Sequence, residues 1–260
     1  MTQKSISFDQ AADVYDATRA LPQGVEGPLA DALVEELRAA KADRVLEVGV
    51  GTGRIARPLA ERGVRVCGVD IARRMLDRLV GQLGPQHIAP DLLLGDATRL
   101  ALANGSFRAV VLCHILHLVS GWEQAVAEMR RALAPGGVII HFCDRFLRED
   151  RVDTGFAKWD ELFAARGFSR TKRPWFKDMN AVFARLGGTR RTREVARRHD
   201  ERTLMWLMKE TRGRVGSWTW EIPEEIFPEC CDEWERWARD EFGEDLSDVT
   251  VYELDVWSFA

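Results

Sequence analysis

A glycine-rich turn directly after a short apolar run constrains this chain more than any other feature of its sequence. The run covers residues 44–48 and reads RVLEV, and the turn after it carries glycine at positions 49, 51 and 53. Glycine lets a chain turn tightly and lets a ligand approach the backbone closely. The pattern therefore predicts a buried strand whose carboxyl end opens onto a ligand-binding loop.

Apolar runs alternate with helical patterns as far as residue 143. The predicted strands cover residues 44–48, 64–69, 92–94, 109–113 and 138–142, and the predicted helices between them cover 55–62, 72–83 and 122–133. Nearly continuous apolar strands that alternate with helices indicate a parallel sheet covered on both faces. Because crossover connections are right-handed, the expected fold is a doubly wound α/β sheet.

The pattern changes after Asp144. Helices are predicted over 156–166, 177–186, 201–211 and 223–242, and strands over 190–198 and 249–259. We predict one domain over 1–260, made of N-terminal cap helices in 1–40, a ligand-binding core in 41–145 and an insertion in 146–176. The last strands fall in 177–200 and 248–260, and a helical cover falls in 201–247.

The formal net charge is −4, but the charges are distributed unevenly along the chain. Residues 166–198 hold eleven Lys and Arg against two acids, whereas residues 221–248 hold twelve acids against two Arg. Two interpretations stay open. The two stretches are solvated faces that attract each other or lie apart, or the basic face meets an anionic substrate or RNA.

The sequence also carries expectations about the cell compartment. No apolar run reaches the roughly 18 residues that a membrane span needs, and the first residues lack the apolar core of a secretory signal. The five cysteines include no C-x-x-C pair and no Cys/His cluster with zinc spacing. We therefore expect a cytoplasmic protein with reduced thiols, no bound metal and no membrane partner.

The glycine spacing indicates which nucleotide the loop binds. A dinucleotide-binding G-x-G-x-x-G motif would place its third glycine at position 54, which is Arg54 here. An acid, Glu47, also precedes the first glycine by two residues. A carboxylate repels a pyrophosphate but attracts the ammonium and sulfonium groups of S-adenosylmethionine (SAM). The loop therefore favours SAM over NAD.

Two further acids follow the next predicted strands. Asp70 ends the second strand and Asp96 follows the third. Asp70 is placed to accept hydrogen bonds from both ribose hydroxyls, and Asp96 to accept one from the adenine amino group, beside the N–H of Ala97. Each acid alone is more typical of a helix cap or a loop. Three acids after three successive strands are harder to assign to capping alone.

Four segments, taken in order, resemble the motifs of class I SAM-dependent methyltransferases. They are VLEVGVGTGR at 45–54, GVDI at 68–71, GDA at 95–97 and LAPGG at 133–137. The likeness is nearest to the ubiquinone- and menaquinone-biosynthesis type and its small-molecule relatives, and it covers residues 8–143. It implies a seven-stranded sheet with an antiparallel last strand.

Residues 15–19, YDATR, resemble the N-terminal element that covers SAM in these enzymes. The resemblance implies that Arg19 pairs with the methionine carboxylate, and a surface helix arginine is the alternative. One departure is Arg108, which stands where the family usually has a structural acid before the fourth strand. The tail beyond Asp144 resembles a subgroup of bacterial methyltransferases and carries no substrate with it. The cofactor-binding residues implied in all are Tyr15, Arg19, Glu47, Gly49, Gly51, Gly53, Asp70, Ile71, Asp96, Ala97 and Cys113.

Acceptor-side residues are expected at the carboxyl ends of the fourth and fifth strands. Methyl transfer from a sulfonium is an in-line displacement, which needs a positioned nucleophile, exclusion of water and, for some acceptors, a base. His114 and His117 follow the fourth strand, and either is a candidate general base because histidine titrates near neutral pH. Asp144 is a candidate to orient a base or bind a cationic amine. A packing role for each histidine, and a cap or a partner of Arg145 for Asp144, remain open.

We predict that the chain methylates O, N or C of a small organic molecule and releases S-adenosylhomocysteine (SAH). As a group, Trp159, Trp206, Trp218 and Trp220 favour a lipophilic or aromatic acceptor, although each alone is more typical of core packing. An RNA methyltransferase is the first alternative, and it rests on the basic stretch. The others are an NAD-dependent oxidoreductase on the same fold and a non-catalytic SAM-binding protein.

Overall fold

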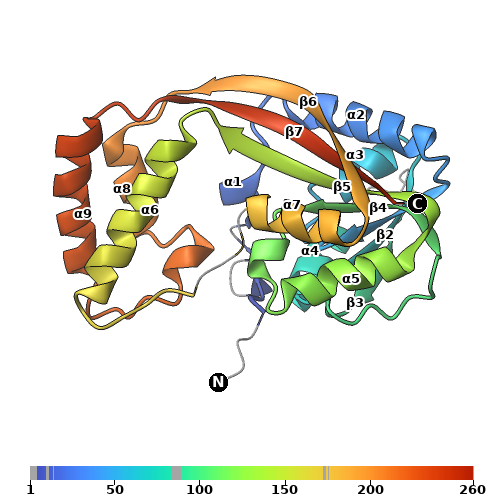
Figure 1. Cartoon of the computed structure of the whole chain (residues 1–260), viewed down its shortest axis with the longest axis horizontal. Helices are drawn as coiled ribbons and strands as arrows, with labels where there is room; N and C mark the ends of the chain where they lie inside the picture. Colours follow the sequence, from blue (N-terminus) through green and yellow to red (C-terminus); the bar gives the residue numbers. More distant parts are fainter. Residues whose placement is uncertain are drawn as a thin grey trace. The chain divides into compact units, whose positions relative to one another are not determined.

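A computed structural model describes residues 5–9, 12–13, 15–83, 89–171, 174 and 176–259. Its centre is a seven-stranded sheet with the strand order β3-β2-β1-β4-β5-β7-β6 (Figure 1). The strands are β1 (Arg44–Val48), β2 (Arg65–Asp70), β3 (Asp91–Leu94), β4 (Phe107–Cys113), β5 (Leu133–Phe146), β6 (Gly188–Asp200) and β7 (Asp248–Phe259). The helices are α1 (Tyr15–Arg19), α2 (Glu26–Ala39), α3 (Ala56–Glu61), α4 (Arg73–Gln82), α5 (Trp122–Ala132), α6 (Glu149–Ala164), α7 (Phe176–Arg185), α8 (Leu204–Arg212) and α9 (Phe227–Phe242), with short 3-10 turns η2 (Leu116–Leu118) and η3 (Ser217–Thr219).

The first five strands run parallel, and their carboxyl ends meet at one edge of the sheet. Val48, the last residue of β1, lies beside Val69 of β2 and Leu112 of β4. The order of strands reverses between β1 and β4, so this edge is the topological switch point of a doubly wound sheet. Ligands of such sheets bind in the crevice beside the switch point.

The last strand inserts between β5 and β6 and runs antiparallel to β5. The N–H of Leu147 donates to the carbonyl of Val249, whereas Cys143 Sγ lies 3.9 Å from Asp255 Oδ2. Residue numbers therefore increase along β7 in the direction in which they decrease along β5, so the two strands are antiparallel. The predicted doubly wound α/β fold with an antiparallel last strand is confirmed.

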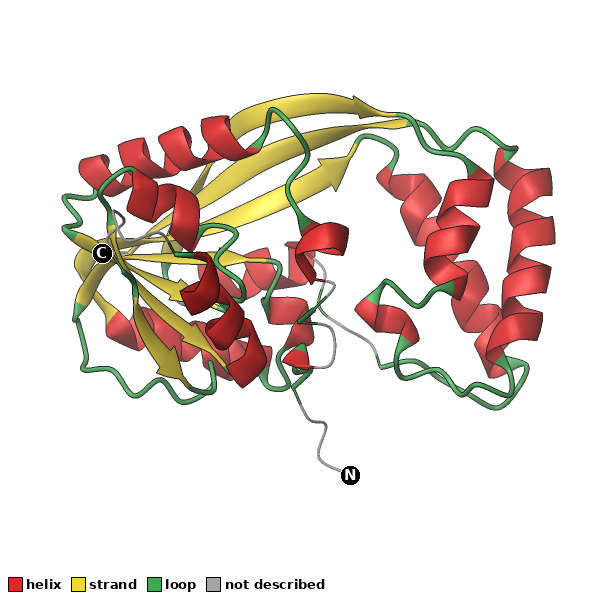
Figure 2. Cartoon of the chain, turned by 180° about the vertical axis from the view of Figure 1, so that it is seen from behind, coloured by secondary structure: helices red, strands yellow, loops and turns green. Residues whose placement is uncertain are grey.

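Helices cover both faces of the sheet (Figure 2). On one face, α2, α3 and α4 pack against alternating side chains such as Val45 and Val111. On the other, α5 and α7 pack against the intervening side chains such as Leu46 and Val110. Because both faces are buried, the strands read as nearly continuous apolar runs, which is why the sequence revealed them.

The chain divides into two compact units. The first comprises residues 1–143, 173–196 and 252–260, and the second comprises 144–172 and 197–251. The second unit joins the predicted insertion to the predicted helical cover, and it has a core of its own. In that core Trp159 stacks on Trp234 with ring centroids 5.1 Å apart, and α6, α8 and α9 surround the pair.

Several elements are longer than their sequence pattern indicates. β5 begins at Leu133 and extends through the turn residues Pro135 to Gly137, with an irregular register against β4. α6 begins at Glu149, where two acids in its first turn suit the positive end of the helix dipole. α8 begins three residues later than the prediction, because Thr203 caps it by accepting a hydrogen bond from the N–H of Trp206. Within the described part of the chain, no helix is both long enough and apolar enough to cross a lipid bilayer.

Candidate functional site

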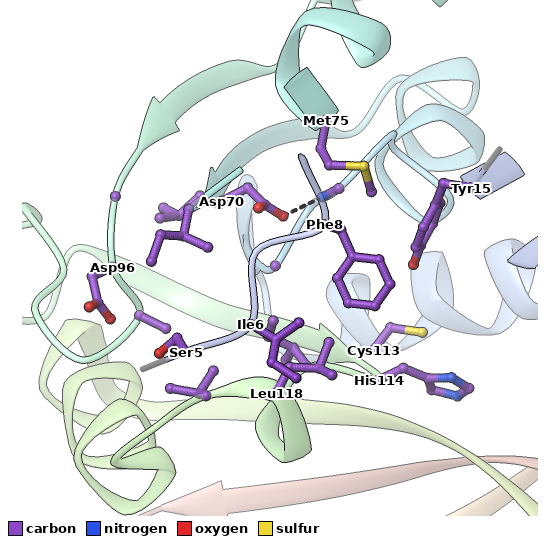
Figure 3. A pocket seen from close by; sticks show the side chains of 18 residues that line it. Ser5, Ile6, Phe8, Tyr15, Asp70, Met75, Asp96, Cys113, His114 and Leu118 are labelled. Carbon is purple, nitrogen blue, oxygen red and sulfur yellow. Dashed lines mark hydrogen bonds between the residues drawn. The ribbon is translucent and has the colours of Figure 1, made fainter. Parts of the chain in front are cut away.

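A pocket lies at the carboxyl ends of β1, β2 and β4 in the first unit (Figure 3). Its cavity measures about 60 Å³. It is lined by Ser5, Ile6, Phe8, Tyr15, Gly49, Gly51, Val69, Asp70, Ile71, Met75, Gly95, Asp96, Ala97, Cys113, His114, Ile115, Leu118 and Val119. The pocket therefore opens at the switch point, where the topology of the sheet leads a ligand to be expected.

The loop after β1 can be built only from glycine at its key positions. Gly49 has φ +77°, and a Cβ atom there would lie 2.7 Å from the side chain of Ile115. Gly53 has φ +85°, and a Cβ atom there would lie 2.3 Å from Leu79 Cδ1. Positive φ disfavours any side chain. The absence of a side chain at Gly49 thus makes room for Ile115, whereas Gly53 lets the loop pack on α4.

Asp70 ties the glycine loop to the start of α4. Its Oδ2 accepts a hydrogen bond from the N–H of Gly51 and its Oδ1 accepts one from the N–H of Ala72, both at 2.8 Å. Burial raises the pKa of the Asp70 carboxyl, although the backbone N–H groups act to lower it. Each carboxylate oxygen has a second lone pair. Asp70 can therefore still accept hydrogen bonds from a ligand.

Asp96 lies at the far end of the pocket from Tyr15 (Figure 3). Its Oδ1 accepts from both the N–H and the hydroxyl of Thr98, each at 2.8 Å. This turn holds the Asp96 carboxylate at the end of β3 and places the neighbouring Ala97 on the pocket wall. Asp96 thus stabilises the turn after β3 and also lines the pocket.

Glu47 is buried and its side chain turns toward the start of α3. It accepts a hydrogen bond from the N–H of Ala56, and its Oε2 has no hydrogen-bond partner. Burial raises the pKa of the Glu47 carboxyl well above its ordinary value, while the charge of Arg54 acts to lower it. Glu47 is not among the described residues that line the pocket.

The structure gives Arg54 a role that the sequence did not predict. In the sequence Arg54 served only to show that position 54 lacks the third glycine of a dinucleotide-binding motif. Its Nη1 donates to the carbonyl of Arg19 at 2.9 Å, and its Nη2 lies 3.0 Å from Cys113 Sγ. The guanidinium thus joins the glycine loop, α1 and the end of β4. The signal that could have found it is its position directly after the last loop glycine.

The N-terminal segment crosses the mouth of the pocket. The N–H of Ile6 donates to the carbonyl of Leu118 at 2.9 Å, and the rings of Phe8 and Tyr15 meet edge to face with centroids 5.5 Å apart. Figure 3 shows Phe8 pointing into the space between Tyr15 and Cys113. The segment therefore supplies part of the pocket wall.

α1 is held on the glycine loop by Asp16. Its carboxylate accepts a hydrogen bond from the Thr52 hydroxyl at 2.5 Å and another from Gln82 at 2.6 Å. Partial burial alone would raise the pKa of Asp16, but these hydrogen bonds lower it below its ordinary value. Tyr15, the first residue of α1, lines the pocket.

Of the three candidates on the acceptor side, His114 lines the pocket. It has φ +51°, a conformation that side chains rarely adopt, at the point where β4 ends. Its ring stacks on Phe142 with centroids 5.8 Å apart, and Phe142 stacks on Tyr252 at 6.2 Å. His117 lies in the η2 turn and Asp144 on β5 in the second unit, and neither is among the described lining residues.

The structure brings most of the predicted cofactor residues together. The predicted residues that line the pocket are Tyr15, Gly49, Gly51, Asp70, Ile71, Asp96, Ala97 and Cys113. Arg19, Glu47 and Gly53 lie beside it without lining it. Each of the three contacts the loop or its neighbours.

Most of the described basic side chains in the stretch 166–198 form ion pairs within their own unit. Side chains that form ion pairs there are Arg166, Arg170, Arg185, Arg190, Arg191, Arg193 and Arg198. In the first unit, for example, Arg191 and Arg193 of β6 meet the carboxylate of Glu36 on α2. Lys172 and Arg173 lie outside the described residues. The pairing weakens the argument for an RNA-binding face.

Among the described residues, no group of three or more His, Cys, Asp or Glu side chains is placed to hold a metal ion. The five cysteines are buried and free of disulfides. Burial raises the pKa of the Cys231 thiol to about 11. At neutral pH that thiol is therefore protonated and poorly reactive.

The segment around the pocket is similar in sequence to known proteins. Residues 46–141 match the family model described as a methyltransferase domain. The demethylmenaquinone methyltransferase of Renibacterium salmoninarum is 36% identical over 134 residues, which cover 51% of this chain and 55% of that protein. The malonyl-[acyl-carrier protein] O-methyltransferase of Serratia marcescens is 31% identical over 134 residues, covering 52% of this chain and 49% of that protein.

The chain thus spans about half the length of these curated relatives. Among solved structures, the YcgJ protein of Bacillus subtilis superposes with a TM-score of 0.58 at 17% identity, covering 88% of this chain and 98% of that one. At that identity the superposition shows the fold alone. The two relatives are named for different acceptors, so similarity to them does not select an acceptor.

Proposed function

Because residues 46–141 form a methyltransferase domain of the class I SAM-dependent type, we propose that the protein transfers a methyl group from SAM to O, N or C of a small organic acceptor. The observation that carries the proposal is the edge formed by Asp70, Gly51 and Asp96. There a carboxylate braces a glycine loop, and a second carboxylate lines the same pocket. Such an edge suits a nucleoside without a phosphate, because phosphate would be repelled by both acids.

The residues present fit SAM or SAH as the ligand. Asp70 would hold the ribose and Asp96 with Ala97 the adenine, at the ends of β2 and β3. Gly49 and Gly51 line the pocket, so a ligand can approach the backbone of the loop there. Tyr15 and Cys113 would border the part of the ligand that extends toward β4.

The chain's own groups supply positioning and proton transfer. SAM, when bound, carries an electrophilic methyl group on its sulfonium. Phe8 and Tyr15 line the pocket and would exclude water from it when the ligand is bound, which would strengthen electrostatic interactions inside it. His114, held by its stack on Phe142, would accept the proton that an O–H or N–H acceptor loses. We also keep His117 as a candidate base and Asp144 as a candidate residue that orients a base or binds a cationic amine.

The acceptor, the partners and the location belong to the same proposal. The proposed acceptor is small and either aromatic or lipophilic, and the relatives, which are named for demethylmenaquinone and for malonyl-[acyl-carrier protein], do not select it. Trp159 and Trp218 pack in the core of the second unit, so they do not add to that argument. We propose a cytoplasmic enzyme that works without nucleic acid, membrane or metal, and that releases SAH.

The proposal is tested by isothermal titration of the purified chain with SAM, SAH and NAD. We expect binding of SAM and SAH in the micromolar range typical of enzyme ligands, with no binding of NAD. Asp70→Ala should abolish that binding, whereas Asp77→Ala, at an exposed acid of α4, should leave it unchanged. If the chain bound NAD but neither SAM nor SAH, the proposal would be refuted, and the glycine loop would be interpreted as the NAD site of an oxidoreductase.

A further inference from the structure

Arg54 brings a positive charge to the end of the pocket opposite Asp96. Its Nη2 lies 3.0 Å from Cys113 Sγ, and Cys113 lines the pocket. Figure 3 shows Asp96 at one end of the pocket and Tyr15 with Cys113 at the other. Arg54 also acts on Tyr15, because burial raises the pKa of that phenol and the charge of Arg54 opposes the rise. The cation therefore lies close to both Tyr15 and Cys113.

We propose that Arg54 binds the carboxylate at the amino-acid end of SAM and SAH, an inference that rests on the proposed function. With ribose at Asp70 and adenine at Asp96, the rest of the same ligand extends toward β4 and α1. That end of the ligand carries a carboxylate and an ammonium group. A guanidinium matches a carboxylate with two parallel N–H donors, which makes it the side chain best suited to that group.

Arg54 gains by exchanging one of its present acceptors for the ligand. Its Nη1 donates to the carbonyl of Arg19 and its Nη2 faces the Cys113 thiol. A thiol is a weak acceptor, and a hydrogen bond to a carboxylate is about twice as strong as one between neutral groups. The bond to the Arg19 carbonyl can persist while Nη2 turns from the thiol to the ligand.

Glu47 and Arg54 together match both charges at that end of the ligand. They flank the glycine loop on its two sides, and the charge of Arg54 acts on the buried Glu47 carboxyl. Glu47 Oε2 is buried and makes no hydrogen bond. A ligand with an ammonium and a carboxylate on one carbon is complementary to such an acid and base pair.

Arg19 is the competing candidate, because the sequence resemblance assigns the carboxylate to it. In the structure Arg19 ends α1 and presents its backbone carbonyl to Arg54. Arg19→Met therefore removes a neighbouring cation but keeps that carbonyl. It is a matched control for Arg54→Met, which removes the guanidinium and keeps a side chain of similar length.

The test is isothermal titration of the full chain with SAH and with 5′-(3-aminopropylthio)-5′-deoxyadenosine, which is SAH without its carboxylate. We expect Arg54→Met to weaken SAH binding about 10- to 100-fold, the range that a hydrogen bond between charged groups carries. The same variant should change binding of the analogue by less than about 3-fold, so the loss depends on the carboxylate. Binding of SAH by Arg54→Lys should fall between that of wild type and that of Arg54→Met. Arg19→Met should change binding of SAH and of the analogue by the same factor, so that it shows no loss that depends on the carboxylate.

Three results would overturn the assignment. Arg54→Met could leave SAH binding unchanged, or weaken SAH and the analogue equally, which would mark a structural role. Arg19→Met could instead show the carboxylate-dependent loss. If wild type bound neither ligand, the proposed function itself would fail, and that result is distinct from the other three. Arg54→Lys keeps the test valid if Arg54→Met does not fold, because a lysine still balances Glu47.

Discussion

At the scale of single residues, the site contains two buried acids in different electrostatic situations. Asp70 accepts hydrogen bonds from several backbone N–H groups, among them those of Gly51 and Ala72, whereas Glu47 accepts one from Ala56 and leaves Oε2 without a partner. Burial raises the pKa of both carboxyls, and it raises that of Glu47 well above its ordinary value. A buried carboxylate without a full set of partners destabilises the fold that holds it. An ionised Glu47 should therefore lower the free energy of unfolding, and a bound cation should raise it again.

Glu47→Gln is expected to unfold at higher urea concentration than wild type at pH 8. A raised folded-state pKa means that the folded chain binds the Glu47 proton more tightly than the unfolded chain does. Wild-type stability is then full below the ordinary glutamate pKa, and it falls as the pH rises toward the raised value, by about 1.4 kcal/mol per pKa unit of difference. The glutamine cannot ionise, so its advantage over wild type should grow from pH 5 to pH 8.

Glu61→Gln is the control for this measurement, because Glu61 is an exposed acid at the end of α3. It should follow the wild-type pH dependence. Glu47→Gln should also bind SAH more weakly than wild type, since it lacks the charge that attracts the ammonium. A stability difference between wild type and Glu47→Gln that stays constant between pH 5 and pH 8 would contradict the argument.

The backbone of His114 gives a second prediction at this scale. Its φ of +51° costs a residue with a side chain about 1 kcal/mol or more. His114→Gly should therefore be more stable than His114→Ala by about 1 kcal/mol in urea unfolding, although both variants lose the stack on Phe142. At Gln124, an exposed position within α5, the order should reverse, with alanine more stable than glycine. The same order at both positions would contradict strain at His114.

Side-chain direction limited what the sequence could predict at this scale. Strand ends placed Asp70, Asp96 and Cys113 at one edge, because parallel strands end together and the apolar runs marked their ends. Spacing could not tell that Glu47 turns toward α3. Nor could it show that Arg54 reaches Cys113, since the two are far apart in sequence and meet only through the β1–β4 pairing.

At the scale of elements, the docking of α1 decides whether the pocket keeps its wall. A helix of five residues is not stable alone in water. Asp16 therefore supplies much of what holds it, through Thr52 on the loop and Gln82 on α4. The carbonyl of Arg19 adds a further contact through Arg54.

Asp16→Ala is expected to speed tryptic cleavage after Arg19 by about 10-fold, since losing about 1.4 kcal/mol of docking energy raises the undocked population by that factor. It should weaken SAH binding as well, because Tyr15 leaves the pocket wall. Asp13→Ala removes an exposed ion pair with Arg74 and should change cleavage less than 3-fold. Equal rates for the two variants would show that Asp16 does not hold α1.

Element boundaries followed from the sequence where local pattern determines them. The buried strands β1, β2 and β4 were predicted within a few residues, because both of their faces are apolar. β5 was predicted too short, because Pro135 and the glycines after it indicate a turn where the structure continues the strand. The start of α6 was missed, because its first turn is charged and lacks apolar periodicity.

At the scale of the whole molecule, the chain builds two units from segments that alternate along the sequence. The second unit depends on contacts such as Trp159 with Trp234, from α6 and α9. No local pattern reveals such a contact, so the sequence indicated an insertion and a cover but not their common core. In contrast, every described residue that lines the candidate cofactor pocket belongs to the first unit.

This arrangement predicts where SAH should protect backbone amides from hydrogen exchange. At a ligand concentration of 100 times Kd, binding stabilises the competent state by about 2.7 kcal/mol. Peptides that cover the glycine loop, the end of β2 and the end of β4 should exchange more slowly by up to about 100-fold. Peptides of α6, α8 and α9 should not change, because their core is separate from the one that carries the pocket. Asp70→Ala should show no protection in either unit, and equal protection in both units of the wild type would place the ligand elsewhere than in this pocket.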